Sequence, residues 1–596
     1  MREDRFSIAR FYQRRILRLF PALFAMLAAT VVAAWVLLFP AGLEEFGQTL
    51  RATVLFLSNL HFAFSYGYFT TSAETNPLLH TWSLAVEEQF YILFPLMLAF
   101  AFRRGKVGAM VIAVMLASVV AALVLGPSSP ESSFFLLHTR AWELLIGAGL
   151  AVGLLAPPRS DRVAGLVGLA GLGAIFAAML WLDRQSSALG LMAALPAVLG
   201  AAALIWAGAR PQNLSARVLS IAPARAVGLI SYSLYLWHWP VFVFWKTGFA
   251  AALTPLSAVA LCALSAALAT ASWAIIEQPA RRLNARLRLR DLLLPVGVAT
   301  ALLIGTTVVA SIGKGRPGRF PPEISQILAA RSDYLASPAR ACLQGALRKS
   351  TSLTPDEIDA GACHFGRNGP ADVVIWGDSH AGALIPAFEA MPANRSAILL
   401  ARPGCPPGDG LQPLGGVFSD DNAAECVDFN AMVARYIDAR PPKAVLLIAR
   451  WGFHLDHEWI AADGAGRARF AEENVADSLR RLVAALTAKG IRVGILAPVP
   501  YPGIEVPEAL ARDITLGGSG EKGLSLQDYS AQNTDALQLL RALQGAQVIE
   551  VAPALCKDGT CPFAQDGQPV FVDSSHLSPL GAMALKPALD AFFAAP

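Results

Sequence analysis

The sequence predicts a multi-span α-helical membrane domain followed by a soluble α/β/α domain with a doubly wound sheet. Of the 596 residues, 55% are apolar and only 15% are charged, which is too apolar for an ordinary soluble protein. The apolar residues are concentrated in the first half, whereas short apolar runs alternate with helical patterns towards the C-terminus. We therefore expect a membrane domain at 1–312, a linker or cap at 313–370 and the α/β domain at 371–596.

The membrane domain is predicted from apolar stretches close to the roughly 20 residues that a helix needs to cross a bilayer. A further segment, 45–66, carries Glu45 and Arg51 among its apolar positions, and we interpret it as an interfacial or re-entrant helix. The predicted spans are nine: 19–39, 84–102, 107–125, 134–155, 163–182, 188–208, 225–245, 255–276 and 291–312.

The distribution of Lys and Arg predicts the orientation of these spans. Basic residues accumulate in alternate loops, beginning with 2–18 and ending with 281–290, and such loops stay in the cytoplasm. An odd number of crossings then places everything after about residue 313 outside the cytoplasm, in a protein of the inner (plasma) membrane whose first span is an uncleaved anchor. The net charge of +4, without a long basic block, does not support nucleic-acid binding.

The cysteines agree with an exported C-terminal domain. Cys262 lies in a predicted span, and the other six all follow residue 313. Six cysteines allow fifteen pairings, of which the local choice is Cys342 with Cys363, Cys405 with Cys426, and Cys556 with Cys561. A zinc site is the alternative, but the wide spacings lack paired C-x-x-C motifs, so we predict disulfides and no metal.

The α/β domain is predicted from four short apolar runs, typical of buried parallel strands. Two helical patterns, 381–391 and 474–489, are expected to cross over between strands. Sheets of this kind place their sites at the carboxyl ends of the strands. The predicted strands are 372–376, 444–449, 493–498 and 548–551.

A candidate nucleophile, Ser379, follows the first of these strands in the motif Gly-Asp-Ser-His. A serine on the turn between a strand and a helix is held at the sheet edge, where backbone N–H groups can stabilise an oxyanion. The alternative is that Ser379 merely caps the helix, which serine commonly does.

A second motif near the C-terminus favours the catalytic interpretation. Asp573 and His576 are three residues apart, between a strand and the last helix. This spacing lets the aspartate reach one ring nitrogen of the histidine while the other nitrogen faces a serine. We therefore predict an acyl-transfer triad of Ser379, Asp573 and His576.

Residues 370–590 resemble the SGNH (GDSL-like) hydrolases, in which this Ser, Asp and His form the triad. The family usually has Gly-x-Asn-Asp after a middle strand, with the Asn donating to the oxyanion, whereas this chain has Ala449-Arg450-Trp451-Gly452. The resemblance thus implies the Ser379 N–H as one oxyanion donor and leaves Arg450 or backbone N–H groups to replace the Asn.

Polar residues within the predicted spans are costly in a bilayer and therefore suggest function, although each alone is more often a structural pair. They lie in the motifs HTWSLAVEEQFYILFP, TRAWELLIG, ISYSLYLWHWP and IEQPARR. The candidates are Glu87, Glu88, Tyr91, Arg140, Glu143, Tyr232, His238 and Glu277.

The order of these motifs, together with FYQRRILRLFPAL near the start, closely resembles acyltransferase family 3 over residues 8–283. The resemblance implies acyl-CoA, usually acetyl-CoA, as the cytoplasmic donor substrate, with no bound cofactor, and a hydroxyl of a surface glycan as acceptor. Arg14, Arg15 and Arg18 would suit the CoA phosphates, or could simply be positive-inside charge. The family begins with two further spans that carry an Arg and a His, whereas no His precedes His61 here. Either the protein starts upstream of Met1, or it is truncated and transfer across the membrane is impaired.

These resemblances favour an O-acyltransferase, most simply an O-acetyltransferase, that acts on a cell-surface polysaccharide such as lipopolysaccharide or peptidoglycan. A membrane-anchored esterase that removes acyl groups from glycans is the second hypothesis. A transporter would fit the spans but would leave the triad idle.

Overall fold

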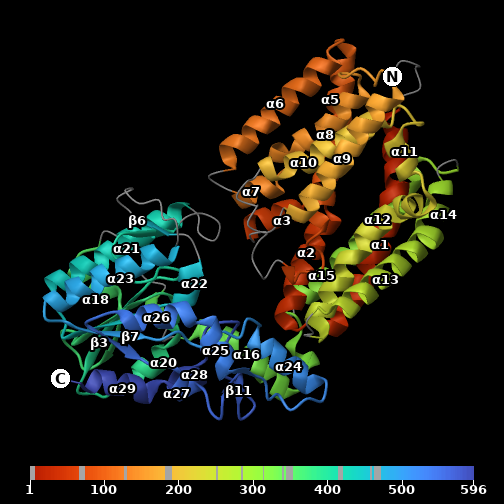
Figure 1. Ribbon diagram of the computed structural model, residues 1–596. Helices are drawn as coiled ribbons and strands as arrows, with labels where there is room; N and C mark the ends of the chain where they lie inside the picture. Colours follow the sequence, from red (N-terminus) through yellow and green to blue (C-terminus); the bar gives the residue numbers. More distant parts are fainter. Residues whose placement is uncertain are drawn as a thin grey trace. The chain divides into compact units, whose positions relative to one another are not determined.

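The structure is a computed structural model that describes residues 7–65, 74–126, 130–181, 191–249, 253–283, 286–312, 314–337, 341–343, 353–413, 420–456, 459–461 and 471–595 (Figure 1). The chain divides into two compact units, Met1–Pro317 and Gly318–Pro596. The division falls a few residues after the predicted end of the last span.

The first unit is built from helices, and several of them are long and strongly apolar. Among its described residues, seven segments are long and apolar enough to cross a membrane: Ile8–Leu37, Thr81–Arg103, Val107–Leu125, Asp161–Leu180, Ala222–Gly248, Pro255–Arg282 and Leu289–Ala310. The helices are α1 (Ile8–Leu37), α2 (Pro40–Val54), α3 (Ser58–Ser65), α5 (Thr81–Arg103), α6 (Val107–Leu125), α7 (Pro130–Phe135), α8 (Leu137–Ala151), α9 (Asp161–Trp181), α10 (Leu191–Ala207), α11 (Leu214–Leu219), α12 (Ala222–Phe249), α13 (Pro255–Ser272), α14 (Gln278–Arg282) and α15 (Leu289–Ile312).

Many apolar side chains of these helices point away from the unit. Leu256 on α13 is 81% exposed and Leu294 on α15 is 76% exposed. A soluble protein rarely exposes so many apolar side chains to water, whereas such a surface is favourable in contact with lipid. The first unit is that of a multi-pass membrane protein.

Two of the nine predicted spans are shorter than expected. The stretch 134–155 contains α8, which has 15 residues, and the described part of 188–208, from residue 191, contains α10, which has 17. At 1.5 Å per residue these helices extend about 22–26 Å, less than the ~30 Å hydrocarbon core. Seven and nine are both odd numbers, so the predicted location of the second unit does not depend on whether these two helices cross the membrane.

The segment 45–66, predicted as a single interfacial helix, lies in two helices, α2 and α3. Phe56 lies between them with a φ of 55°. A right-handed helix cannot continue through a left-handed residue, so the chain must turn at this position.

Helices α9 and α10 approach closely through two glycines. A Cβ on Gly171 would lie 2.7 Å from the backbone oxygen of Gly200, and a Cβ on Gly200 would lie 2.6 Å from that of Gly171. Only glycine allows this separation, which is how small residues bring membrane helices together.

The second unit contains a six-stranded sheet in the order β1-β3-β2-β5-β7-β9. All neighbouring pairs are parallel except β1 with β3. The sheet strands are β1 (Cys363–Gly366), β2 (Val373–Gly377), β3 (Ser396–Ala401), β5 (Ala444–Ile448), β7 (Arg492–Leu496) and β9 (Ala546–Ile549). Shorter strands form three two-stranded pairs: β4 (Leu411–Pro413), β6 (Trp459–Ala461), β8 (Gly523–Ser525), β10 (Thr560–Pro562), β11 (Ala564–Gln565) and β12 (Gln568–Pro569).

Both faces of this sheet are buried beneath helices. Ile375 and Leu446 belong to one core with Phe388 and Phe592, whereas Val374 belongs to the opposite core with helices α21, α23 and α26. Strands buried on both faces have continuous apolar runs, which is why β2, β5 and β7 could be predicted. The fourth predicted strand, β9, is a partly exposed edge strand. The helices are α16 (Pro322–Ala336), α18 (Pro355–Gly361), α19 (Ser379–Ala383), α20 (Ile385–Glu389), α21 (Asp420–Ala439), α22 (Trp451–Asp456), α23 (Ala471–Ala488), α24 (Val506–Thr515), α25 (Leu526–Gln532), α26 (Thr534–Ala542), α27 (Ala552–Leu555), α28 (Pro579–Ala584) and α29 (Lys586–Ala594).

The predicted helix 381–391 is two short helices, α19 and α20. Pro386 lies in the first turn of α20. Proline has no N–H to continue the hydrogen bonds of the preceding helix, so α19 ends and a new helix begins. The predicted helix 474–489 is α23, which starts three residues earlier than expected.

The six cysteines that follow residue 313 form three disulfides with the predicted local pairing. The bridges are Cys342–Cys363, Cys405–Cys426 and Cys556–Cys561. Cys262 is a free thiol on α13. Because all six cysteines are paired with each other, none is available as the zinc ligand that the alternative required.

Candidate active site

Ser379 begins α19 directly after strand β2, at the carboxyl edge of the sheet. The preceding Gly377 has no room for a side chain, because a Cβ there would lie 2.2 Å from the Ile448 oxygen and 2.6 Å from the Ala381 Cβ. The residue that caps α19 is Asp378, whose Oδ1 accepts the His380 N–H at 2.8 Å. The alternative role of Ser379 as the helix cap is therefore filled by its neighbour, and the Ser379 hydroxyl is left for other contacts.

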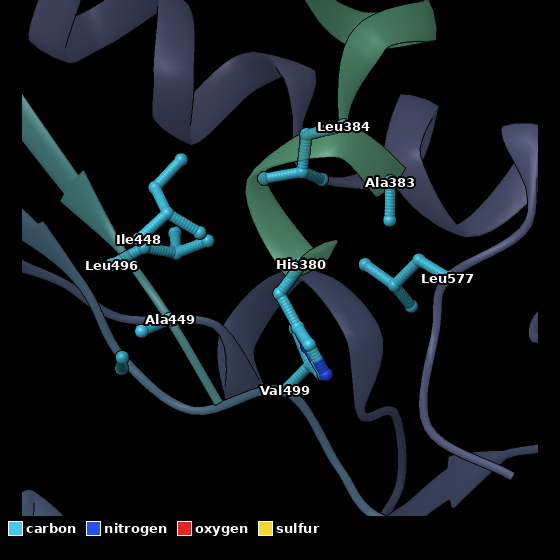
Figure 2. Close-up of a pocket in the computed structure, with 9 residues that line it drawn as sticks. His380, Ala383, Leu384, Ile448, Ala449, Leu496, Val499 and Leu577 are labelled. Carbon is cyan, nitrogen blue, oxygen red and sulfur yellow. The ribbon is translucent and has the colours of Figure 1, made fainter. Parts of the chain in front are cut away.

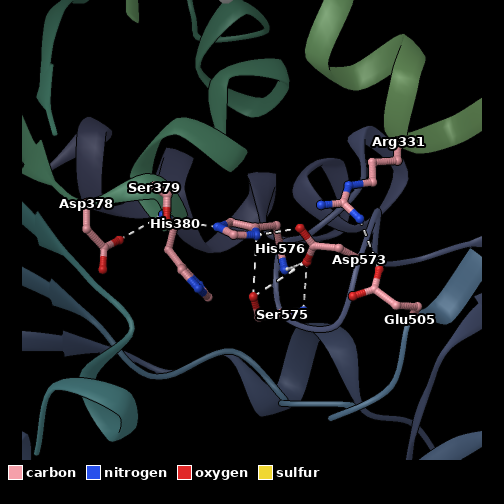
Figure 3. Close-up of polar contacts among 8 residues, drawn as sticks. All are labelled: Arg331, Asp378, Ser379, His380, Glu505, Asp573, Ser575 and His576. Carbon is pink, nitrogen blue, oxygen red and sulfur yellow. Dashed lines mark hydrogen bonds and ion pairs between the residues drawn. The ribbon is translucent and has the colours of Figure 1, made fainter. Parts of the chain in front are cut away.

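The Ser379 hydroxyl lies beside His576, which in turn lies beside Asp573 (Figure 3). The distance from Ser379 Oγ to His576 Nε2 is 2.8 Å, and that from His576 Nδ1 to Asp573 Oδ2 is 2.7 Å. The carboxylate accepts the Nδ1–H, so Nε2 is left with a lone pair directed at the serine. This is the arrangement in which an imidazole removes a hydroxyl proton as the oxygen attacks a carbonyl.

The loop that holds Asp573 and His576 also stabilises the charge of the carboxylate. Asp573 Oδ1 accepts the backbone N–H groups of Ser575 and His576, each at 2.8 Å. Burial alone would raise the pKa of Asp573, but the hydrogen bonds from His576 and these backbone groups hold it well below its usual range. The Asp573 carboxylate is therefore negatively charged when His576 takes a proton from Ser379, and it stabilises the resulting imidazolium.

Arg450 is expected from the sequence to contribute to the oxyanion site, and the structure shows a different use for its backbone. The Arg450 N–H donates to Asp378 Oδ2 at 2.9 Å, and the buried His454 donates to the same oxygen from Nε2 at 2.9 Å. This N–H is therefore not available to an oxyanion. The backbone N–H of Ser379 makes no hydrogen bond within the described part of the chain and remains the best candidate donor.

His380, the residue after the serine, projects into a small enclosed space between α19 and the ends of the neighbouring strands (Figure 2). The space of about 10 Å³ is lined by apolar side chains such as Leu384, Leu496 and Leu577. Burial, opposed by the charge of Asp378, lowers the pKa of His380 to about 3. His380 is therefore neutral at physiological pH.

Acid is expected to destabilise the second unit through His380. Its folded pKa of about 3 lies below its ordinary value of 6.5, so between these values the unfolded chain binds a proton that the folded chain does not. This contribution to stability is complete above pH 6.5 and falls as the pH drops, by about 2 kcal/mol at pH 5. Urea denaturation of the wild type and of His380→Asn, each at pH 7 and pH 5, measures this loss of stability. Every other titrating group contributes equally to both proteins, so the difference between them is due to His380. An equal loss in the two proteins would contradict this assignment.

Helix α16, within the predicted linker or cap, packs beside the triad. Its Tyr334 is in one buried cluster with Ala383 of α19 and Val572, the residue before Asp573. Arg331 on the same helix pairs with Glu505 at 3.3 Å (Figure 3). Burial raises the pKa of Glu505, and the negative charge of Asp573 raises it further, although Arg331 opposes both.

The membrane unit gathers four of its predicted candidates into one cluster. Arg15 on α1 lies 3.2 Å from Glu88 and 4.0 Å from Glu87, both on α5, and its guanidinium lies 3.3 Å from the centroid of the Tyr91 ring. Arg14 and Arg18 are exposed on α1 and do not take part in these ion pairs.

The other predicted membrane residues lie in separate local contacts. Arg140 pairs with Glu143 at 2.9 Å, and Tyr232 donates to the Leu19 oxygen at 3.0 Å. Glu277 accepts from Ser233 at 3.0 Å. The His238 Nδ1 lies 2.8 Å from the Tyr235 carbonyl oxygen. The structure thus brings Arg15, Glu87, Glu88 and Tyr91 together but not the full predicted set.

Two residues beside Ser379 are part of the site without having been predicted. Asp378 belongs to the Gly-Asp-Ser-His motif, but its role as the acceptor for both His454 and Arg450 could not be predicted from it. His454 lies 76 residues away in the sequence and carries no local signal. In the membrane unit, the buried His80 was likewise not predicted, and its ring lies 5.2 Å from that of Tyr235 and 5.7 Å from that of His238.

Comparison with known proteins agrees with the two-part organisation. Residues 1–274 match the family described as the acyltransferase domain, and residues 342–591 match the SGNH domain that is fused to such domains. The chain is 31% identical over 252 residues to YrhL of Bacillus subtilis, provisionally named a peptidoglycan O-acetyltransferase. It is 28% identical over 298 residues to the O-acetyltransferase OatA of Staphylococcus aureus.

These similarities are partial. The first covers 39% of each protein, and the second covers 47% of this chain and 49% of OatA, so the chain matches half or less of the length of these relatives. The structural match with the periplasmic domain of a lipopolysaccharide acetyltransferase from Salmonella ser. Paratyphi A covers 44% of this chain and 98% of that domain. The sequence identity is 16% and the TM-score is 0.31. The chain thus combines a match to the acyltransferase domain at residues 1–274 with a match to the SGNH domain, of the kind fused to such domains, at residues 342–591.

Proposed function

We propose that this protein is an O-acyltransferase, specifically an O-acetyltransferase, that modifies hydroxyls of a cell-surface polysaccharide such as peptidoglycan or lipopolysaccharide. The observation that carries the proposal is the hydrogen-bonded series Ser379, His576 and Asp573 in an SGNH domain that is fused to an acyltransferase domain. The names of OatA, an O-acetyltransferase, and YrhL, provisionally a peptidoglycan O-acetyltransferase, support acetyl as the acyl group, and the name of YrhL supports peptidoglycan as an acceptor.

The proposed reaction has two halves at Ser379. In the first, His576 takes the hydroxyl proton while Ser379 Oγ attacks the acyl carbonyl, and the carrier leaves with a proton. In the second, a sugar hydroxyl attacks the acyl-serine ester, its proton passes through His576 to Ser379 Oγ, and the acyl group is transferred to the sugar. The Ser379 N–H stabilises the oxyanion in both halves.

The acyl donor proposed for the membrane unit is cytoplasmic acyl-CoA, which is a substrate and not a resident cofactor. Arg15 with Glu87, Glu88 and Tyr91, and the exposed Arg14 and Arg18, are the residues proposed to serve this donor. An arginine-rich helix end is suited to phosphate groups because each guanidinium binds them with two N–H donors.

Ester-linked acetate on the surface polysaccharide tests the direction of the reaction. In the organism that carries the gene, replacing it by the Ser379→Ala variant should remove this acetate, because the acyl group can no longer be attached to the serine. More acetate in the variant than in the wild type would instead identify an esterase that removes the group. Alkaline release of acetate from purified polysaccharide gives the measurement.

The second unit is proposed to lie outside the cytoplasm, in the periplasm of a cell with two membranes. The alternation of basic loops and the three disulfides both support this location. A reporter enzyme that is active only outside the cytoplasm should be active when it is fused after residue 320. The same reporter fused after residue 104, next to Arg103 and Arg104, should be inactive, and the opposite pair of results would reverse the orientation.

A further inference from the structure

A fixed arginine lies at the sheet edge beside the proposed nucleophile. The guanidinium of Arg450 lies 4.8 Å from the centroid of the Phe453 ring and 4.4 Å from that of the Tyr501 ring. Aromatic rings attract a guanidinium through their negative faces and restrict its movement. The position of this cation is therefore set before any ligand arrives.

The strand order places this arginine next to Ser379. Ser379, Arg450 and Tyr501 follow strands β2, β5 and β7, which are neighbours in the parallel sheet. Neighbouring strands are ~4.8 Å apart, and their carboxyl ends lie at one edge. All three residues therefore lie along the same short stretch of that edge.

Two backbone hydrogen bonds fix this arrangement to the triad. The Arg450 N–H is bonded to Asp378, the residue before Ser379. The Gly503 N–H donates to the carbonyl oxygen of Ser574, which lies between Asp573 and His576 in the chain, at 3.4 Å. The segment from Tyr501 to Gly503 thus contacts Arg450 on one side and the segment 573–576, which carries Asp573 and His576, on the other.

The side chains at this position suit a carbohydrate. Tyr501 is 37% exposed, so part of its ring remains open to a ligand. In the described part of the chain, the guanidinium of Arg450 contacts the two rings, while its backbone bonds to Asp378 and accepts the His454 N–H. The N–H edges of the guanidinium are thus left without a carboxylate among the described residues. A sugar ring has a C–H face that packs on an aromatic ring and adjacent oxygens that accept hydrogen bonds from a planar fork of donors.

We propose that Arg450 and Tyr501 form the acceptor subsite of the second unit. Arg450 donates hydrogen bonds to oxygens next to the sugar hydroxyl that attacks the acyl-serine, and the Tyr501 ring packs against the same sugar. This inference rests on the proposed transferase function, and it replaces the role of Arg450 in the oxyanion site. An oxyanion donor acts in every turnover, whereas an acceptor contact acts only when the sugar, and not water, receives the acyl group.

The ratio of transfer to hydrolysis tests the proposal. The full-length protein in detergent receives p-nitrophenyl acetate as donor and, as acceptor, envelope polysaccharide from a strain that lacks the protein. Arg450→Gln and Tyr501→Ala are expected to raise the acceptor KM about tenfold and to lower the ratio of acetylated polysaccharide to free acetate about tenfold. Tyr501→Phe keeps the ring and should restore most of the transfer.

The controls separate an acceptor subsite from a general loss of folding or of catalysis. Arg480→Gln removes an exposed arginine of α23 that pairs only locally with Asp477, and it should match the wild type. Equal losses of transfer and hydrolysis in Arg450→Gln, or no loss of either in both Arg450→Gln and Tyr501→Ala, would overturn the subsite. If Ser379→Ala retains both activities, the proposed function itself fails. Since the bond from Arg450 to Asp378 uses the backbone, it survives these substitutions.

Discussion

Ser379→Ala is expected to abolish the hydrolysis of a small activated acyl ester by the purified full-length protein, with a loss of about 10³-fold or more. The reason is that the Ser379 hydroxyl is the only group placed by the structure at 2.8 Å from the lone pair of His576 Nε2 among the described residues. His576→Ala should cost about as much, and the double variant little more, because members of a triad act as one unit. Release of the chromophore from p-nitrophenyl acetate gives the rates.

Two further measurements distinguish catalysis from structure at this site. Asp573→Asn should lower the rate while leaving the protein folded, because the aspartate orients His576 and does not bond to the substrate. Since the helix cap is Asp378, Ser379→Ala should also leave stability within about 0.5 kcal/mol of the wild type. If Ser379→Ala turned over ester at the normal rate and lost the ~1 kcal/mol typical of a removed cap, the catalytic role would be refuted.

Arg15→Gln is expected to reduce ester-linked acetate on the surface polysaccharide by 100-fold or more. The side chains of Arg15 and Glu88 are 17% and 8% exposed, so removing the arginine leaves a buried carboxylate without its charged partner. Breaking such a pair costs about 3–5 kcal/mol, and this substitution also removes a proposed contact for the donor phosphates. Acetate on the polysaccharide is measured together with the amount of protein in the membrane.

The double variant Arg15→Gln with Glu88→Gln separates the two causes. Two amides can bond to each other without a buried charge, so the membrane level of this variant should recover while acetylation remains low. Recovery of acetylation as well would mean that the pair is purely structural. Arg290→Gln is a matched control, because Arg290 is a basic residue of the same unit with 75% of its side chain exposed.

Local sequence patterns are sufficient for much of the fold. Strands β2, β5, β7 and β9 lie within about two residues of their predicted positions. Strands β2 and β5 and most of β7 are buried and therefore have continuous apolar runs, whereas β9 is a partly exposed edge strand that contains Gln547. The pairing of the cysteines also follows from proximity along the chain. Strand β3 has the same kind of signal, in Ser396–Ala401, but it is absent from the predicted strands.

The membrane unit shows where such patterns fail. Apolar composition predicts nine spans, but α8 is 15 residues long, and α10 has 17 residues in the part of the chain that the structure describes. Hydropathy counts apolar residues, whereas the length of a helix depends on where its backbone hydrogen bonds end. The same limit explains the division of 45–66 at Phe56, whose positive φ has no sequence signature.

The sequence by itself determined that the chain has a membrane part and an α/β part, and it identified the segments that carry Ser379, Asp573 and His576. Only the tertiary structure decided which distant residues meet. Ser379 and His576 are 197 residues apart in the chain yet lie within 2.8 Å, and Arg15 and Glu88 are 73 residues apart yet form an ion pair. Strand order places Arg450 and Tyr501 beside the nucleophile in the same way. The reason is physical: periodicity and turn chemistry act over a few residues, whereas these contacts result from how whole strands and helices pack, which depends on the entire core.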